Sequence, residues 1–172
     1  MGKLLVVVDM QVDFITGPLG TPEAQGIITS VEKKVKNALE QKSTVVYTMD
    51  THSEDYLETL EGRNLPVKHC IFGTEGWEVI PELKGLLLEL ELFKKPTFGS
   101  MELIEKFRNE SFSEIELCGV CTDICVVSNA LLLRAAFPNT KIVVDSSATA
   151  GSSKESHEAA LVVMQKNHIE II

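Results

Sequence analysis

The chain has little basic charge for its size and lacks any long apolar segment. Its 172 residues include 16 Lys and Arg against 25 Asp and Glu, which gives a net charge of −9. This charge would repel phosphate groups, so we expect neither nucleic acid nor a membrane surface as a partner. A helix that spans a bilayer needs about 20 consecutive apolar residues. The longest apolar stretch, 83–92, is interrupted by Lys84, Glu89 and Glu91.

We expect no export signal, and the chain has only four cysteines. The N-terminal segment has no small-residue cleavage site of a secretory signal peptide, so we expect a cytoplasmic protein. In that compartment the cysteines are expected to be reactive, metal-bound or buried rather than paired in disulfides. No repeat or low-complexity segment occurs, and 44% of the residues are hydrophobic. Length and composition therefore predict a single domain, residues 1–172, with a sizeable core.

Strand and helix patterns alternate along the chain. Residues 50–82 are polar and contain several Gly and Pro, which is typical of a long functional loop. The alternation predicts an α/β fold, a doubly wound three-layer sandwich with a mostly parallel six-stranded sheet. Ligands in such folds bind beyond the carboxyl ends of the strands. The expected strands are 4–8, 44–48, 88–93, 114–120, 141–145 and 169–172, and the expected helices are 31–39, 101–108, 125–136 and a last one that Ser152 or Ser153 opens and that runs to about 166.

Two charged residues follow expected strands. Asp9 comes directly after a fully apolar run, where partial desolvation would raise its pKa and make it a usable base. Its alternative role is to cap a turn. Lys95 follows the third strand, and Pro96 biases it to an extended conformation. Its charge could depress the pKa of a neighbouring thiol, although solvated lysines at a strand end are the more common case.

The fourth strand leads into a segment with three cysteines. Cys125 falls in the first turn of the expected helix, where backbone N–H groups and the helix dipole would favour a thiolate. The same N–H groups could hold a developing oxyanion. Cys118 is interpreted as a buried strand residue. A rival interpretation takes Cys118, Cys121 and Cys125 together as metal or iron–sulfur ligands.

The polar region 50–82 carries a candidate metal site. Asp50 and His52 are two residues apart, so in an extended segment both side chains lie on the same side. Carboxylate and imidazole ligands suit a divalent ion such as zinc, iron or manganese. His69 and a glutamate could complete the ligand set. By itself the Asp-x-His pattern is weak, and the default interpretation is a group of surface polar residues.

Three motifs together resemble the isochorismatase-like cysteine hydrolases, and most of all the nicotinamidases. They are Asp9 in VVDMQVDF, Lys95 in KPTF and Cys125 in GVCTDICV. The resemblance covers the chain from the first strand to the last and implies a catalytic triad. Asp9 would take the thiol proton, Lys95 would hold the acid and the thiolate together, and Cys125 would form a thioester with the substrate carbonyl.

The resemblance also implies a non-proline cis peptide between Val120 and Cys121. It would turn the Cys121 N–H toward the oxyanion, beside the N–H of Cys125. Cys121 would thus act through its backbone and not through its thiol. The presence of Cys125 argues against vinyl-ether hydrolysis, because true isochorismatases lack this nucleophile.

Nicotinamidases keep an Asp-x-His and a later His, which are Asp50, His52 and His69 here. The resemblance implies one divalent ion, zinc first and iron or manganese as alternatives, which binds the pyridine nitrogen and aligns the ring. Many members have a further ligand between these residues. This chain offers Glu58 or Glu61, and we favour Glu61 because it lies nearer His69 in the sequence.

The expected activity is hydrolysis of nicotinamide to nicotinate and ammonia. The tryptophan that some members carry before the last histidine is absent here, and Trp77 lies further on. Another small amide or carbamoyl C–N bond is therefore the alternative substrate, and a binding protein without chemistry is a third hypothesis. The resemblance implies a homo-oligomer, a dimer or tetramer. Phe14, Phe98 and Leu65 are the expected walls of the substrate site.

Overall fold

The protein forms one six-stranded sheet in which all neighbouring strands are parallel. The computed structural model describes residues 2–172. The strand order is β3-β2-β1-β4-β5-β6, which confirms the predicted doubly wound α/β fold. The strands are β1 (Gly2–Val8), β2 (Thr44–Asp50), β3 (Glu91–Lys95), β4 (Phe112–Val120), β5 (Lys141–Ala150) and β6 (Glu170–Ile171).

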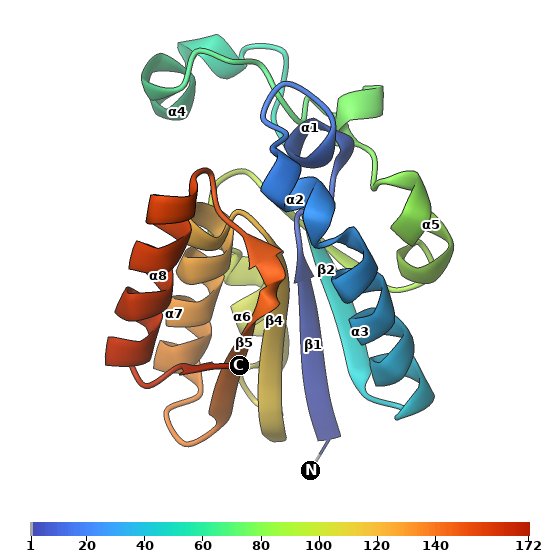
Figure 1. Cartoon of the computed structure of the whole chain (residues 1–172), viewed down its shortest axis with the longest axis vertical. Helices are drawn as coiled ribbons and strands as arrows, with labels where there is room; N and C mark the ends of the chain where they lie inside the picture. The colour runs from blue at the N-terminus through green and yellow to red at the C-terminus, as the bar shows by residue number, and fades with distance from the viewer. Residues whose placement is uncertain (1) are drawn as a thin grey trace.

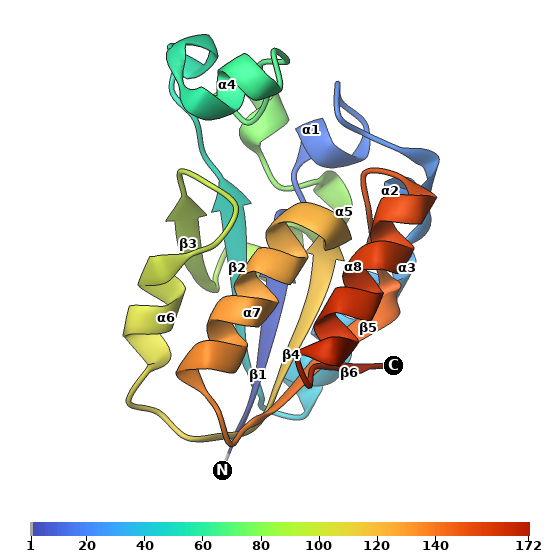
Figure 2. The same cartoon turned by 90° about the vertical axis from the view of Figure 1, so that its left-hand side faces the viewer.

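Helices cover both faces of the sheet (Figures 1 and 2). One face carries α1 (Val12–Ile15), α2 (Pro22–Gly26), α3 (Ile28–Glu40) and α5 (Pro81–Leu87). The other face carries α6 (Met101–Phe107), α7 (Val127–Ala136) and α8 (Lys154–Lys166). None of the helices in residues 2–172 has the length and apolarity to cross a membrane. The short elements are η1 (Tyr56–Glu58), α4 (Leu60–Asn64), η2 (Glu75–Trp77) and the π-helical turn η3 (Thr122–Val126).

The core consists of two apolar layers, one on each face of the sheet, and β1 contributes side chains to both. Leu5 and Val7 point to the layer under α3, whereas Leu4, Val6 and Val8 point to the layer under α7. A strand with both faces covered must be apolar at every position, which explains the unbroken run in the sequence. The carboxyl end of this central strand lies on the side of the sheet where α1 and α4 are found (Figure 1).

Several boundaries differ from the sequence prediction. The third strand begins at Glu91 and not at 88, because Leu88 still closes α5, which Pro81 opens. The fifth strand continues past 145 to Ala150 after an irregularity in its register with β4. Region 50–82 is not a bare loop, since it contains η1, α4 and η2 and the start of α5. Short helices of this kind have too few residues for a periodic pattern.

Gly119 allows β4 to run against the end of β1. Its φ is +109°, and a Cβ atom there would lie 2.1 Å from the carbonyl oxygen of Val8. Only glycine accepts both the positive φ and the close backbone approach. Asp9 follows Val8 directly, so this contact helps to set where the Asp9 side chain lies.

Candidate active site

Three separate elements bring Asp9, Lys95 and Cys125 into contact. Asp9 follows β1, Lys95 ends β3 and Cys125 lies in η3. The Lys95 ammonium is 2.6 Å from Asp9 Oδ2 and 3.4 Å from the Cys125 sulfur. All three side chains are buried. The ammonium is therefore held between the carboxylate and the thiol and away from solvent.

Asp9 is held by backbone and side-chain contacts at the end of β1. Its φ is +49°, a left-handed conformation that non-glycine residues adopt rarely and mostly at functional sites. The Thr48 hydroxyl donates a hydrogen bond to Asp9 Oδ1 at 2.7 Å, and the Asp9 N–H donates to the Thr48 carbonyl at 3.2 Å. One carboxylate oxygen thus faces Thr48 and the other faces Lys95.

Burial dominates the protonation of the three groups. It raises the pKa of Asp9, and the charge of Lys95 offsets part of that increase. Burial alone would lower the pKa of Lys95, but Asp9, Cys125 and Asp50 together raise it well above its usual value. Burial, followed by the Asp9 charge, raises the pKa of the Cys125 thiol. This direction is opposite to the one that the sequence indicates for a thiol at a helix start, and a thiol in this state needs a base to take its proton.

The difference at Cys125 has a structural reason. The sequence predicts a helix that starts at this residue, whereas α7 begins at Val127 and Cys125 lies inside the π-helical turn η3. The peptide between Val120 and Cys121 is cis. No acceptor in residues 2–172 lies within hydrogen-bonding distance of the Cys121 N–H.

A second group of polar side chains lies beside the first. Each of four residues offers one atom that could bind a metal ion, and these four atoms all lie within 4.8 Å of one another. The residues are Asp50, His52, Glu61 and His69. His69 Nε2 is 3.4 Å from Asp50 Oδ2 and 3.8 Å from Glu61 Oε1. His52 Nε2 is 2.8 Å from Asp50 Oδ2 and 3.5 Å from Glu61 Oε1.

These distances fit a bound divalent ion. Tetrahedral ligands about 2.0–2.2 Å from zinc lie roughly 3.3–3.6 Å from each other. Three of the four distances come near that range, and the fourth is a hydrogen bond between His52 and Asp50. Glu58 is exposed and does not belong to the group. The sequence-based choice of Glu61 over Glu58 therefore agrees with where the two side chains lie.

Buried partners orient the ligands of this group. His69 Nδ1 is 2.8 Å from the Val67 carbonyl, so it carries the proton and leaves Nε2 free to bind a cation. The Gln11 amide donates to the Asp50 carbonyl and accepts from the Asp50 N–H, both at 2.8 Å. The Tyr56 ring packs against both histidine rings. The sequence analysis missed Gln11, Tyr56 and Thr48.

The cluster is charged even without a cation. Burial alone would lower the pKa of His52, but hydrogen bonds with Asp50 and Glu61 raise it to about 9. Burial would raise the pKa of Asp50, but the two histidines and Lys95 lower it overall. The two carboxylates that stabilise a proton on His52 would also stabilise a divalent cation at the same place.

One cavity of about 760 Å³ joins the two groups. Cys121 and Cys125 line one side, and Asp50, His52, Glu61 and His69 line another. The predicted walls also border it, with Phe14 buried and Leu65 and Phe98 partly exposed. A cavity of this size accommodates a small organic ligand.

The rival interpretation of three cysteines as metal ligands is wrong. Cys118 belongs to the core layer under α3, whereas Cys125 belongs to the layer under α7, on the opposite face of the sheet. All four cysteines are free. Within residues 2–172, the only group of three or more metal-binding side chains is the one around Asp50.

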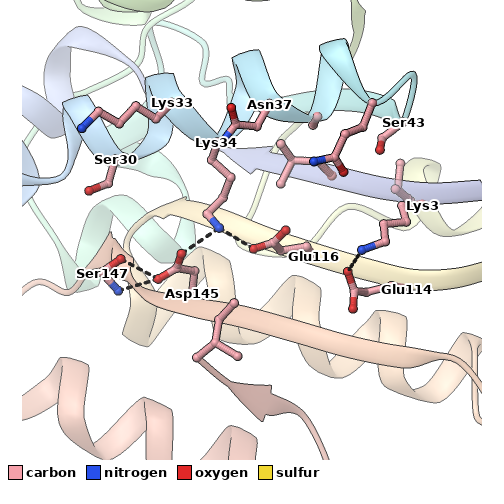
Figure 3. Close-up of a pocket in the computed structure, with 15 residues that line it drawn as sticks. Lys3, Ser30, Lys33, Lys34, Asn37, Ser43, Glu114, Glu116, Asp145 and Ser147 are labelled. Carbon is pink, nitrogen blue, oxygen red and sulfur yellow. Dashed lines mark hydrogen bonds and ion pairs between the residues drawn. The ribbon is translucent and has the colours of Figure 1, made fainter.

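A second cavity, of about 440 Å³, lies between α3 and the starts of β1 and β4. Figure 3 shows that Lys34 joins Glu116 and Asp145, at 2.5 and 2.7 Å. Lys3 pairs with Glu114 at 2.8 Å. Each side-chain carboxylate of this cavity has a lysine partner, and the ion pairs of Lys34 join α3 to β4 and β5.

Comparison with known proteins identifies the family. The model of the isochorismatase domain matches residues 3–172. An uncharacterised isochorismatase family protein of Bacillus subtilis, PncA, is 31% identical over 173 residues, which covers 94% of this chain and 93% of that protein. The nicotinamidase of Schizosaccharomyces pombe is 26% identical over 210 residues and covers 98% and 91%. The structure of the pyrazinamidase of Pyrococcus horikoshii in complex with zinc aligns with a TM-score of 0.86 at 26% identity, over 100% of this chain and 99% of that one. With a family match over nearly its whole length and the same fold throughout, this chain belongs to the isochorismatase family.

Proposed function

We propose that the chain is a cysteine-dependent amidohydrolase that converts nicotinamide and water to nicotinate and ammonia. The observation that carries the proposal is that one cavity borders both the Cys125 thiol and a ligand set for a divalent ion. Lys95 contacts this thiol and the Asp9 carboxylate behind it. The nicotinamidase and the zinc-bound pyrazinamidase among the similar proteins support this activity.

Asp9, Lys95 and Cys125 would carry out the covalent chemistry. Asp9 takes the thiol proton, and the Cys125 sulfur attacks the carboxamide carbon. The C–N bond then breaks, Asp9 returns the proton to the leaving ammonia, and a thioester remains on Cys125. Water, with its proton taken by Asp9, then attacks the thioester carbon. The C–S bond breaks, the acid leaves, and Asp9 returns the proton to the Cys125 sulfur. The buried Lys95 ammonium would stabilise the negative charge on the Asp9 carboxylate and on the Cys125 sulfur during these steps.

The oxyanion would bind to backbone N–H groups. Val120 and Cys121 form the cis peptide before η3, and the Cys121 N–H has no acceptor within residues 2–172. Cys121 and Cys125 both border the cavity. We therefore assign their two N–H groups to the carbonyl oxygen of the substrate.

Asp50, His52, Glu61 and His69 would hold one divalent ion. Zinc suits two imidazoles and two carboxylates best, and iron and manganese are alternatives. Such an ion supplies a Lewis acid for a ring nitrogen, so it would anchor the substrate rather than activate water. Phe14, Phe98 and Leu65 would then border the ring.

A second candidate is hydrolysis of another small amide or carbamoyl C–N bond. The cavity favours it because Leu19, Leu60 and Leu65 contribute aliphatic surface beyond the two aromatic walls. Such a substrate would need no ring nitrogen, and its turnover would not depend on the ion.

The test is release of ammonia from nicotinamide by the purified, metal-loaded protein. We expect release to stop when a chelator removes the ion and to return when a divalent ion is added, because ring orientation accounts for a rate factor of about 100 or more. Unchanged release after verified metal removal would contradict the anchor and favour the metal-free alternative. If the metal-loaded protein releases no ammonia although Cys125 is alkylated rapidly, nicotinamide is not its substrate.

We also propose that the protein acts in the cytoplasm as a homo-oligomer and binds neither nucleic acid nor membrane. Four free thiols suit a reducing compartment. The net charge of −9 disfavours anionic partners. The homo-oligomer, a dimer or tetramer, is proposed from the family resemblance.

A further inference from the structure

Asn129 is a buried polar residue to which the chemistry above gives no role. It lies in α7, one turn after Cys125, and its side chain has no solvent exposure. The amide nitrogen donates to the Phe98 carbonyl at 3.1 Å and to the Cys125 carbonyl at 2.8 Å. The amide oxygen accepts from the Ser100 N–H at 2.9 Å. One side chain thus joins the turn of the nucleophile to the segment that follows β3.

Only an amide satisfies all three partners. Ser100 offers an N–H, which needs an acceptor, and the other two partners are carbonyl oxygens, which need donors. A carboxylate would repel the two carbonyls, and an apolar side chain would make none of these three hydrogen bonds. The amide orientation follows from the same partners.

The segment that Asn129 holds also determines where Lys95 lies. Lys95 ends β3, and its ammonium donates to the Thr97 carbonyl at 3.2 Å, within the same segment. The side chain of Phe98 borders the substrate cavity. A second contact joins the same two regions of the chain. The Lys95 ammonium, at the end of β3, lies 3.4 Å from the Cys125 sulfur in η3.

We propose that Asn129 is a positioning residue that sets the distance between the Lys95 ammonium and the Cys125 thiol. This inference rests on the proposed cysteine chemistry but not on the identity of the amide. Asn129 touches no reacting atom, so it acts only through the two backbones that it joins. Loss of its hydrogen bonds would let the Lys95 segment move relative to η3, and misplacement of about 1 Å can cost a factor of about 100 in rate.

The test compares Asn129→Leu with the wild type and with Ser128→Ala. Ser128 is the neighbouring residue in α7, and its hydroxyl donates a hydrogen bond to the Ile124 carbonyl and not to the segment that follows β3. We expect Asn129→Leu to lower kcat for nicotinamide about tenfold or more while KM changes less than about threefold. The rate of Cys125 alkylation by iodoacetamide at fixed pH should fall about tenfold, and Ser128→Ala should change neither rate.

A second variant covers the case in which Asn129→Leu does not fold. Asn129→Ser keeps a donor for the Cys125 carbonyl four residues earlier but is too short to reach Phe98 and Ser100. It should fold and still show the lower kcat and slower alkylation. Wild-type kcat and alkylation in either folded variant would overturn the inference. If the wild type does not hydrolyse nicotinamide, the proposed function fails, but the alkylation rates still decide the role of Asn129.

Discussion

Replacing Cys125 with alanine is expected to lower turnover by roughly 10⁴-fold or more and to leave the fold intact. Among residues 2–172 the Cys125 sulfur is the thiol that contacts the Lys95 ammonium, so its loss removes the nucleophile of the proposed mechanism. Alanine occupies less volume and introduces no buried charge, so the melting temperature should change little. Ammonia release and thermal unfolding followed by circular dichroism measure the two effects.

Cys118→Ala is the matched control for this variant. Cys118 is fully buried in β4 but lies in the opposite core layer. The loss of its sulfur should lower stability slightly, as small cavities do, and leave ammonia release close to that of the wild type. If the Cys125→Ala variant retained substantial activity, the covalent mechanism would be wrong.

Replacing Lys95 with methionine is expected to destabilise the protein by about 3–5 kcal/mol at neutral pH and to remove activity. Methionine fills a similar volume without charge. Asp9 and Asp50, which lie 2.6 and 3.3 Å from the ammonium, would then be buried carboxylates without their cation. Urea unfolding and ammonia release measure the losses.

The loss of stability should depend on pH in a defined direction. Burial already raises the pKa of Asp9, and Lys95 is what opposes that increase. Without Lys95 the folded-state pKa of Asp9 rises further above its unfolded value of about 3.9. A carboxyl group with a higher pKa in the folded state loses stability as pH rises. The deficit of Lys95→Met should therefore be smaller at pH about 5 than at pH about 7.

Lys94→Met is the control for the lysine variant. The Lys94 ammonium lies over the Phe72 ring at 4.6 Å, on the side of β3 away from the buried site. Such a contact is worth about 0.5–1 kcal/mol at an exposed position. A Lys95→Met protein as stable as Lys94→Met at every pH would contradict the role of the buried ion pair.

The parts of the site that the sequence predicts are those at the carboxyl ends of strands. Three of these residues end or follow a strand, and parallel strands bring such ends to one side of the sheet. They are Asp9, Asp50 and Lys95. The family resemblance then supplied the expected pairing with Cys125. The two-residue spacing of Asp50 and His52 predicted that their side chains lie on the same side of an extended segment.

The parts that escaped prediction depend on tertiary contacts. Three such residues are Thr48, Gln11 and Asn129. Each makes a buried hydrogen bond to a residue that lies 29 or 39 positions away in the chain. No local pattern shows which distant group such a side chain will bind. The direction of the pKa shift at Cys125 also differs from the expected one, because Cys125 lies buried in a π-helical turn and not in the first turn of a helix.

The central claim is that a bound ion selects a ring nitrogen while Cys125 attacks the amide. It is tested most directly by comparing kcat/KM for nicotinamide and benzamide, which differ in that nitrogen, before and after metal removal. We expect the metal-loaded protein to prefer nicotinamide by about 100-fold or more and the preference to vanish with the ion. Equal kcat/KM values for the two amides in the metal-loaded protein would contradict the account.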